Sequence, residues 1–385
     1  MLKAAFVTPG AYPVPSSMGG SVERVVEKVV PILSHAVDTR IYGRVAKRLP
    51  AIDRLSGVVR IERLPAADKR RYIRLVRDRL VKFNPDVIQI ENRPQWVPYL
   101  KKTFPNARVW LNLHSTTFVN PPYMNVSSRA RYLGAADTIQ VNSEFLKSYI
   151  GNIVPGSAGK IKVNPLGVDV ARFTGKSSPE GMRISAEWRR KKGWGRRPIV
   201  LYVGRLVPQK GIHYLLDAVP ALVAQVPDVL VVIVGSARYG SHRPTPYSRR
   251  LRRQAARWSK HVHFQPYVPH DQIPHWFVMA DVAVVPSVGQ EAFGLVNLEA
   301  MAAELPVVAT KAGGMKEIVV DRMTGYLVAN EKTKLAAELA AHVGFLLGNE
   351  ALRKDMGRNG RERVLAEFQW KHTAERWLKF QNERK

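Results

Sequence analysis

The stretch Glu291-Ala-Phe-Gly-Leu-Val-Asn-Leu-Glu299 decides how this chain folds, because with its flanks it predicts a strand, a loop and a helix in succession. The apolar run Val282–Pro286 before it is typical of a buried strand, and a helix is expected to begin at Leu295. Open α/β sheets bind their ligands at the carboxyl ends of their strands. We therefore expect Glu291 and Glu299 to border one binding site at such an edge.

These two carboxylates and the helix start between them suit a sugar nucleotide. One carboxylate can accept hydrogen bonds from sugar hydroxyls and the other from the ribose, while free amides at a helix N-terminus can hold phosphate. The plain alternative is a loop-to-helix turn with one solvated and one capping glutamate. The surrounding sequence has to decide between the two interpretations.

Composition narrows the class of protein. The chain has 385 residues, 45% hydrophobic and 24% charged, which is typical of a folded protein of two domains. The absence of cysteine excludes disulfides, thiolate catalysis and cysteine-based zinc sites, and the ten histidines form no metal-ligand motif. The apolar runs are too short for a membrane-spanning helix or a signal peptide, so we expect a cytoplasmic protein without a metal.

The net charge of +29 is extreme and is concentrated in residues 69–82, 183–197 and 238–260. Such a field attracts polyanions, so an anionic membrane surface or a cell-envelope polymer is a candidate partner, with the protein at the inner face of the membrane or in a spore coat. A general bias toward basic residues is the alternative. No nucleic-acid-binding module is visible, so nucleic acid is not an expected partner.

The pattern of elements predicts an α/β fold in two halves. Short apolar strands alternate with amphipathic helices, which indicates βαβ units and parallel sheets. A segment rich in Gly, Ser, Pro and basic residues, 174–198, interrupts this pattern and is expected to connect the halves. The predicted strands are Ala4–Thr8, Asp38–Tyr42, Val87–Glu91, Val109–Leu113, Asp137–Asn142, Ile199–Val203, Val229–Gly235, His261–Phe264, Val282–Pro286, Leu305–Ala309 and Gly325–Val328. The predicted helices include Ser21–Ser34, Lys69–Lys82, Gly211–Gln225, Leu251–Lys260, Asp271–Met279 and a helical tail from Glu331.

Two cations follow the first strand of the second half. In Gly204-Arg-Leu-Val-Pro-Gln-Lys-Gly211, the glycine lets the backbone turn, and Arg205 and Lys210 stand before a predicted helix N-terminus. A guanidinium, an ammonium and free amides together suit a diphosphate, whose negative charge grows as it leaves. Surface cations of a very basic protein are the alternative, and the expected position beside Glu291 favours the diphosphate.

Weaker signals lie in the first half and near the end of the second. Gly19-Gly20 precedes the first helix and allows close approach of the backbone to a ligand, and His114 ends a predicted strand. The turn Ala312-Gly-Gly314 follows the strand after Glu299. No G-x-G-x-x-G, P-loop or G-x-S-x-G motif occurs, which argues against dinucleotide dehydrogenases, P-loop NTPases and α/β-hydrolases.

Taken in order, these motifs and the segment Pro165-Leu-Gly-Val-Asp169 resemble the retaining glycosyltransferases of family 4. The resemblance covers nearly the whole chain and is weakest across residues 43–85 and 172–197. The segment Ile88–Ser115 is also similar to the bacterial branch that includes spore-coat-associated members.

The resemblance implies a GT-B fold, in which two Rossmann-like domains with parallel sheets face an interdomain cleft and the C-terminal helix crosses back to the first domain. The implied boundaries are residues 1–173 for the acceptor-side domain, 174–197 for a linker, 198–365 for the donor-side domain and 366–385 for the returning helix.

The resemblance also implies a role for each motif. Arg205 and Lys210 neutralise the diphosphate, Glu291 binds the transferred sugar and Glu299 the ribose. Gly20 closes on the phosphate, His114 lies by the sugar and acceptor, and no metal or cofactor is needed. The expected catalytic residues are His114, Arg205, Lys210 and Glu291. The expected donor-binding residues are Gly19, Gly20, Gly204, Tyr267, Val268, Phe293, Gly294, Leu295, Val296 and Glu299.

The predicted reaction is transfer of a hexose-type sugar from a UDP-, GDP- or ADP-sugar to a hydroxyl acceptor, with retention at the anomeric carbon. No carboxylate is placed as a nucleophile, so we expect front-face attack with the leaving phosphate taking the acceptor's proton. Two alternatives stay open on the same fold. They are a nucleotide-sugar epimerase or phosphorylase-like enzyme, and a non-catalytic scaffold that binds polyanions.

Overall fold

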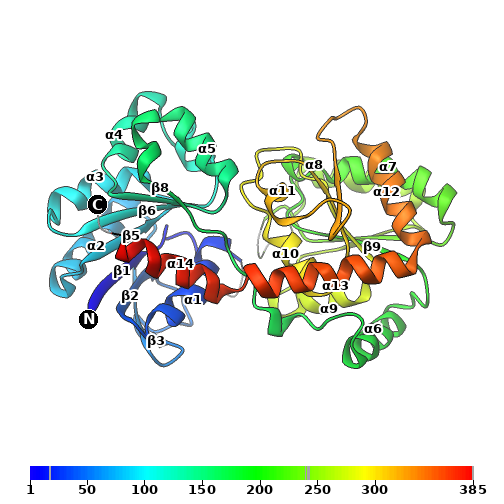
Figure 1. The fold of residues 1–385 in the computed structure, drawn as a ribbon, viewed down its shortest axis with the longest axis horizontal. Helices are drawn as coiled ribbons and strands as arrows, with labels where there is room; N and C mark the ends of the chain where they lie inside the picture. Colours follow the sequence, from blue (N-terminus) through cyan, green and yellow to red (C-terminus); the bar gives the residue numbers. More distant parts are fainter. Residues whose placement is uncertain (17–18, 239, 241–242, 384–385) are drawn as a thin grey trace. The chain divides into compact units, whose positions relative to one another are not determined.

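The computed structural model describes residues 1–16, 19–238, 240 and 243–383. The chain divides into two compact units (Figure 1). Unit 1 contains Met1–Leu166 and Trp370–Lys385, and unit 2 contains Gly167–Gln369.

Unit 1 is built on an eight-stranded sheet in the order β3-β4-β2-β1-β5-β6-β7-β8, parallel except for the pair β3 and β4. Its strands are β1 (Leu2–Val7), β2 (Val37–Arg44), β3 (Ile52–Leu55), β4 (Val59–Leu64), β5 (Val87–Glu91), β6 (Arg108–Leu113), β7 (Thr138–Val141) and β8 (Ile161–Val163). Its α-helices are α1 (Ser21–Leu33), α2 (Lys69–Phe83), α3 (Val97–Thr103), α4 (Arg129–Gly134), α5 (Glu144–Ile153) and α14 (Trp370–Asn382). Its 3-10 turns are η1 (Pro94–Trp96), η2 (Thr117–Val119), η3 (Val126–Ser128) and η4 (Pro155–Lys160).

Unit 2 is built on a six-stranded parallel sheet in the order β11-β10-β9-β12-β13-β14. Its strands are β9 (Ile199–Val203), β10 (Leu230–Val234), β11 (Val262–Gln265), β12 (Val282–Val285), β13 (Val307–Thr310) and β14 (Gly325–Val328). Its α-helices are α6 (Pro179–Lys192), α7 (Ile212–Gln225), α8 (Pro246–Ala255), α9 (Ile273–Met279), α10 (Leu295–Ala302), α11 (Met315–Ile318), α12 (Leu335–Gly348) and α13 (Glu350–Glu367). Its 3-10 turns are η5 (Val170–Arg172), η6 (Pro208–Lys210), η7 (Ala256–Trp258) and η8 (His270–Gln272).

Both sheets reverse their strand order beside the first strand of the unit. In unit 1, β2 lies on one side of β1, and the later strand β5 lies on the other side of β1. In the same way, β10 and β12 flank β9. A ligand in an open α/β sheet binds at such a switch point, beyond the carboxyl ends of the strands. The two expected sites are therefore the loops after β1 and β5 and the loops after β9 and β12.

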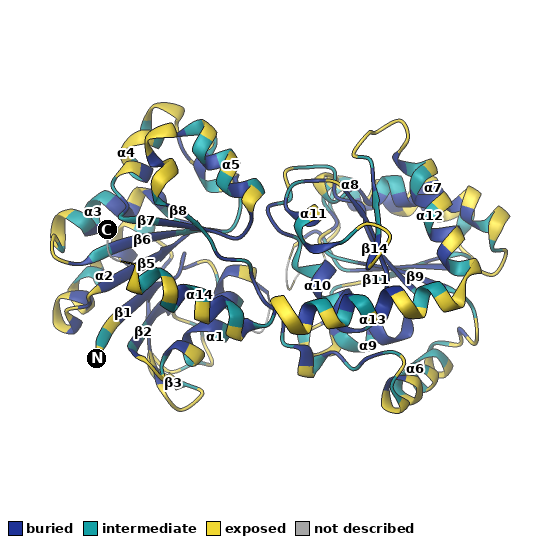
Figure 2. Ribbon diagram, viewed as in Figure 1, coloured by how far each residue is buried: buried dark blue, intermediate teal, exposed yellow. Residues whose placement is uncertain are grey.

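The central strands form the core of each unit, because helices cover a parallel sheet on both faces. Every residue of β5 is buried (Figure 2), and so is every residue of β10, Leu-Val-Val-Ile-Val. Such continuous burial explains why these strands appear in the sequence as unbroken apolar runs. It also makes the polar residues Gln89 and Glu91 of β5 notable, because both are buried.

Helix α14 is part of unit 1, where it packs against α1 (Figure 1). Trp377 is 1% exposed, with its ring centroid 5.2 Å from that of Trp110 and 5.7 Å from that of Phe6. Its indole N–H donates to Oε1 of Gln89 over 2.7 Å. One aromatic side chain thus fixes the end of the chain to the centre of the sheet.

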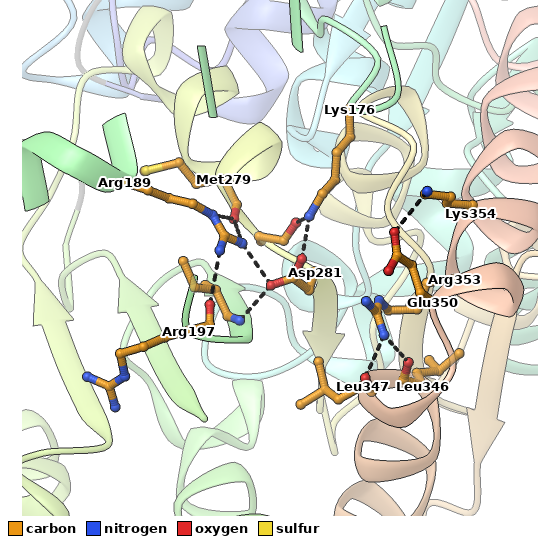
Figure 3. A network of polar contacts seen from close by, with 12 residues as sticks. Lys176, Arg189, Arg197, Met279, Asp281, Leu346, Leu347, Glu350, Arg353 and Lys354 are labelled. Carbon is orange, nitrogen blue, oxygen red and sulfur yellow. Dashed lines mark hydrogen bonds and ion pairs between the residues drawn. The ribbon is translucent and has the colours of Figure 1, made fainter. Parts of the chain in front are cut away.

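The predicted linker is wrong in one respect, because residues 174–197 contain helix α6 and belong to unit 2. The helix lacks an apolar stripe, and Gly181 is its buried position. Instead, Lys176 and Arg189 converge on Asp281 at 2.6 and 2.8 Å (Figure 3). The Asp281 carboxylate also accepts from the backbone amide of Ile199 at 2.8 Å, which ties the segment to the start of β9.

Two smaller boundaries also differ from the sequence prediction. Unit 1 ends at Leu166 rather than at residue 173. The helix expected over 251–260 runs from Pro246 to Ala255, because Thr245 and Ser248 form a capping box ahead of it.

Across the described ranges, no helix has the length and apolar character needed to span a bilayer, and no three His, Asp or Glu residues are grouped as metal ligands.

We predict that Trp377→Ala lowers the free energy of unfolding of unit 1 by about 3–5 kcal/mol, because it opens a cavity beneath α14. Urea unfolding followed by circular dichroism measures the change. Val81→Ala on α2 is the control, because Val81 is 60% exposed. Equal, small effects of the two substitutions would contradict the anchoring role of Trp377.

Candidate functional site

The loops after β9 and β12 meet at the switch point of unit 2. The amide of Val288 donates to the carbonyl of Gln209 over 2.9 Å, which joins the two loops. Gly211 has φ +67°, and a Cβ there would lie 1.8 Å from the carbonyl oxygen of Pro286. The glycine is therefore required both for the left-handed turn and for the close approach of the loops.

This contact brings Lys210 and Glu291 together. The Lys210 ammonium forms an ion pair with Oε2 of Glu291, and the Ser287 hydroxyl donates to the same oxygen over 3.2 Å. The side chains of Lys210 and Glu291 are only 25% and 18% exposed. Burial by itself raises the pKa of Glu291, but the charge and hydrogen bond of Lys210, together with Ser287 and Arg205, hold that pKa below its ordinary value. The site therefore keeps a carboxylate and an ammonium side by side.

Arg205 supplies a further charge. Its side chain is exposed, and its positive charge also lowers the pKa of Glu291. Its carbonyl accepts from the Tyr202 hydroxyl over 2.9 Å, and the preceding Gly204 amide donates to Val234 over 3.0 Å. These two hydrogen bonds fix the turn at the end of β9, and the guanidinium of Arg205 extends from this turn.

The turn Ala312–Gly314 holds the backbone of Glu291. The Gly314 amide donates to the Glu291 carbonyl over 2.9 Å, and a Cβ on Gly313, at φ +57°, would lie 2.0 Å from the same carbonyl oxygen. This loop from β13 therefore fixes the position of the carboxylate from the side opposite to Lys210's loop.

Helix α10 begins at this point without a side-chain cap. Gly294 is its N-cap at φ +92°, and the first turn carries no acidic residue. The partly exposed Leu295 and Val296 follow, so their amides lie at a helix end that favours an anion. Glu299 is half-buried in the second turn.

Other expected donor-binding residues are less close to this cluster. The Phe293 side chain is 3% exposed and packs 6.4 Å from the Phe368 ring, so it serves the core. Tyr267 is half-buried and Val268 is buried in the loop after β11, which is two strands away from β9. The structure therefore groups Arg205, Lys210 and Glu291 most directly.

His114 belongs to a polar cluster at the edge of unit 1. Its Nε2 lies 2.7 Å from Oε2 of Glu91, a fully buried carboxylate, and its amide donates to Oδ1 of Asn92 over 2.9 Å. The side-chain amide of Gln89 donates to Oε1 of Glu91 over 2.6 Å. The side-chain oxygen of Gln89 in turn accepts a hydrogen bond from the indole N–H of Trp377. Glu91 thus orients the imidazole and is itself oriented by α14.

Sequence reasoning missed Glu91 as a site residue. The sequence does contain an indication of it. Gln89 and Glu91 lie two positions apart, and so on one face, in an otherwise apolar strand, and a buried polar residue needs a hydrogen-bond partner.

Gly19 and Gly20 lie at φ +125° and +102° before α1. Beside them, Oε1 of Glu23 accepts from the Tyr12 amide over 3.2 Å, and a Cβ on Gly20 would lie 2.6 Å from Oε2 of Glu23. Burial raises the pKa of Glu23, and the negative charge of Glu91 adds to this while His114 opposes it. Glu23 is a second carboxylate at this edge that the motifs did not indicate.

A cavity of about 690 Å³ lies far from these groups along the strands of unit 2, beside α6 and Asp281. Asp281 immediately precedes β12, whereas Glu291 follows it, so the two lie at opposite ends of that strand. Lys176 donates hydrogen bonds to Asp281 and to the carbonyl of Ala280. Arg189 donates to Asp281 and to the carbonyls of Met279 and Arg197. These two cations therefore have a structural role. We place the functional site at the other edge of the sheet, beyond the carboxyl ends of the strands.

Comparisons with known proteins agree with this geometry. A family model described as "Glycosyl transferases group 1" matches residues 184–363. The chain is 30% identical over 378 residues to Spore coat protein SA of Bacillus subtilis (strain 168), covering 98% of each chain. It is also 30% identical over 375 residues to Putative glycosyltransferase YtcC of the same strain, covering 97% of this chain and 90% of that one. The chain belongs to the group 1 glycosyl transferases.

Solved structures of low identity support the fold of this glycosyltransferase. Anabaena HepE in complex with UDP-glucose matches with a TM-score of 0.77, at 20% identity and over 99% of both chains. Sucrose-phosphate synthase from Thermosynechococcus elongatus matches with a TM-score of 0.79, at 23% identity, over 99% of this chain and 98% of that one. The predicted GT-B fold and the resemblance to family 4 and its spore-coat-associated branch are confirmed. As a member of this group, the chain transfers a sugar from a nucleotide-sugar donor.

We predict that Lys210→Met raises the pKa of Glu291, because it removes a charge and a hydrogen bond that hold this pKa below its ordinary value. In the wild type the lowered pKa stabilises the fold above the ordinary glutamate value, and this stabilisation is lost as pH falls through the folded-state value. The difference in unfolding free energy between wild type and variant should therefore be largest at neutral pH and shrink in acid.

Denaturant unfolding over a series of pH values measures this difference. Lys311→Met, an exposed cation on the loop after β13, is the matched control and should show no comparable pH dependence. A difference between wild type and Lys210→Met that stays constant with pH would mean that the ion pair does not set the ionisation of Glu291.

Proposed function

We propose that the chain transfers a hexose from a nucleotide-diphosphate sugar to a hydroxyl acceptor with retention of anomeric configuration. The observation that carries this proposal is the ion pair of Lys210 and Glu291, with Arg205 beside it, at the switch point of unit 2. Two cations and one ionised carboxylate match the diphosphate and the hydroxyls of such a donor.

Each group has a separate task in this proposal. Arg205 and Lys210 stabilise the charge that develops on the departing diphosphate, and the amides at the start of α10 add their dipoles. Glu291 accepts hydrogen bonds from hydroxyls of the transferred sugar, Glu299 binds the ribose, and Tyr267 and Val268 contact the base. The two side-chain cations supply the charge that a metal supplies in other transferases, so we propose that no metal is required.

The acceptor hydroxyl is activated by the donor itself in this proposal. Glu291 is engaged by Lys210 and Ser287, which fits a hydroxyl-binding role better than attack on the anomeric carbon. The acceptor therefore attacks from the face of the leaving group, and a phosphate oxygen takes its proton. His114, oriented by Glu91, positions the sugar and acceptor, and Gly19 and Gly20 bind the phosphate.

Two of the similar proteins have a nucleotide sugar in their names or titles. A GDP-mannose-dependent mannosyltransferase of Mycolicibacterium smegmatis is 34% identical over 244 residues, covering 61% of this chain and 59% of that one. The HepE structure contains UDP-glucose, at an identity that supports the fold alone. UDP-, GDP- and ADP-hexoses are the donors to test, and a thermal-shift panel identifies the one that stabilises the native state.

Arg205→Ala and Lys210→Ala are each expected to lower turnover at least about tenfold, or about 1.4 kcal/mol, because each removes a charge that stabilises the leaving diphosphate. Steady-state kinetics with the donor identified by thermal shift measures the loss. Lys311→Ala, which removes an exposed charge, should keep wild-type turnover. Wild-type turnover in both site variants would remove the basis for the diphosphate role.

Product stereochemistry tests retention. Proton NMR during the first turnovers should show the donor's own anomeric configuration in the product. Inversion would contradict the front-face mechanism, and an epimerised nucleotide sugar would favour the epimerase alternative.

A second role is supported by the net charge of +29. The basic segments 69–82, 183–197 and 238–260 suit an anionic membrane surface or an envelope polymer, at the inner face of the membrane or in a spore coat. Within the described residues, helix α2 presents Arg70, Arg71 and Arg74 to solvent. Salt-sensitive sedimentation with anionic vesicles, together with no response to any nucleotide sugar, would support a non-catalytic scaffold.

A further inference from the structure

Three cations of unit 1 gather at the same edge as His114. Arg44 is the last residue of β2, Arg93 follows β5, and Lys69 is the first residue of α2. Strands β2 and β5 flank β1, so Arg44 and Arg93 stand on either side of the loop that follows β1. The three residues come from separate elements, and their positions depend on the sheet order.

Backbone carbonyls hold two of these cations against that loop. The Lys69 ammonium donates to the carbonyls of Gly10 and Ala66 over 2.6 and 2.5 Å. Arg44 donates from Nη1 to the carbonyl of Ala11 over 3.1 Å. An ammonium has three donors and a guanidinium five, so both residues retain unused N–H groups.

Arg93 is fixed by aromatic rings. Its guanidinium carbon lies 4.5 Å from the centroid of Phe118 and 5.9 Å from that of Trp96. A stacked guanidinium uses its face and leaves its edge N–H groups able to donate. One of them, on Nη1, donates to the Asn92 carbonyl over 2.9 Å. The Asn92 side chain also accepts the amide of His114, so Arg93 is adjacent to the expected acceptor position.

The cluster lacks a compensating anion. Among the described residues, none of Arg44, Lys69 and Arg93 forms an ion pair with a carboxylate. Burial lowers the pKa of Lys69, and the charges of Arg93 and Arg44 lower it further. Glu23 is the carboxylate whose charge both Lys69 and Arg93 feel, and its own pKa is raised by burial. Lys69 and Arg93 are half-buried, and like charges held together there without a carboxylate in contact are costly unless a ligand supplies the negative charge.

We propose that Arg44, Lys69 and Arg93 bind a phosphate group of the acceptor. This inference rests on the proposed transferase function and names its acceptor class, a hydroxyl compound that carries a phosphomonoester or phosphodiester. A bidentate guanidinium and an ammonium match phosphate oxygens, and this grip presents the acceptor's hydroxyl beside His114. The phosphate belongs either to a soluble acceptor or to a lipid head group, and the two sources are separable by experiment.

Binding is tested on the full chain in a Lys210→Ala background, which weakens the phosphate site of unit 2. The probes are glycerol 3-phosphate, measured by calorimetry, and phosphatidylcholine vesicles with or without phosphatidylinositol, measured by sedimentation. Adding Lys69→Gln or Arg93→Gln is expected to weaken binding at least about tenfold, as loss of a charge-assisted hydrogen bond does. Binding of glycerol 3-phosphate indicates a soluble acceptor, and binding of phosphatidylinositol vesicles alone indicates a lipid-linked one.

Lys102→Gln is the matched control, because Lys102 is exposed on α3 of unit 1, lies outside the basic segments, and its loss changes the net charge equally. The control is expected to bind within about twofold of its parent, and Arg93→Lys is expected to retain part of the binding. Circular dichroism and melting temperatures establish that each variant is folded. Absence of binding to every probe, or equal weakening by Lys102→Gln, would overturn the proposal.

Nucleotide binding by the wild type and by Lys69→Gln keeps this test separate from that of the proposed function. If UDP, GDP and ADP all fail to bind the wild type, the transferase proposal fails. If one of them binds both proteins while no phosphate probe binds, only the assignment of the acceptor fails.

Discussion

The ion pair between Lys210 and Glu291 is the interaction on which the proposed function of this fold depends. It exists because the loops after β9 and β12 meet, and they meet because Gly211 leaves room where a Cβ would collide with the carbonyl oxygen of Pro286. Gly313, in the loop after β13, likewise leaves room for the carbonyl oxygen of Glu291. The pair keeps both groups charged in a half-buried position, so an ammonium and a carboxylate stand side by side, as the proposed binding of phosphate and sugar hydroxyls requires. Preorganised charge of this kind needs no rearrangement as the leaving group departs.

A second preorganised cluster occupies unit 1. Its histidine is oriented by Glu91, and Glu91 is oriented through Gln89 by a tryptophan of the last helix. The C-terminal helix therefore has a task beyond closing the core, since it supports the residue expected beside the acceptor. The three cations around the loop after β1 would give that acceptor a defined chemistry, so donor and acceptor would each be recognised through phosphate.

Local sequence predicted the parts of this enzyme that depend on local chemistry. Glycines at strand ends, carboxylates flanking a helix start and unbroken apolar strands sufficed for the α/β fold and for Arg205, Lys210 and Glu291 as one cluster. The support of His114 was not predictable, because Gln89 and Trp377 are 288 positions apart and meet only through tertiary packing. Helix α6 was missed for another reason. Charged contacts to Asp281 anchor it in place of an apolar stripe, although Ser178, Pro179 and Gly193 mark its two ends.

The most direct test of this account compares nucleoside diphosphates with the matching monophosphates by calorimetry on the wild type and on Lys210→Ala. If Arg205 and Lys210 form a diphosphate site, one diphosphate binds the wild type at least about tenfold more tightly than its monophosphate, and the variant loses that preference. Equal affinity of the wild type for the two would contradict the central claim.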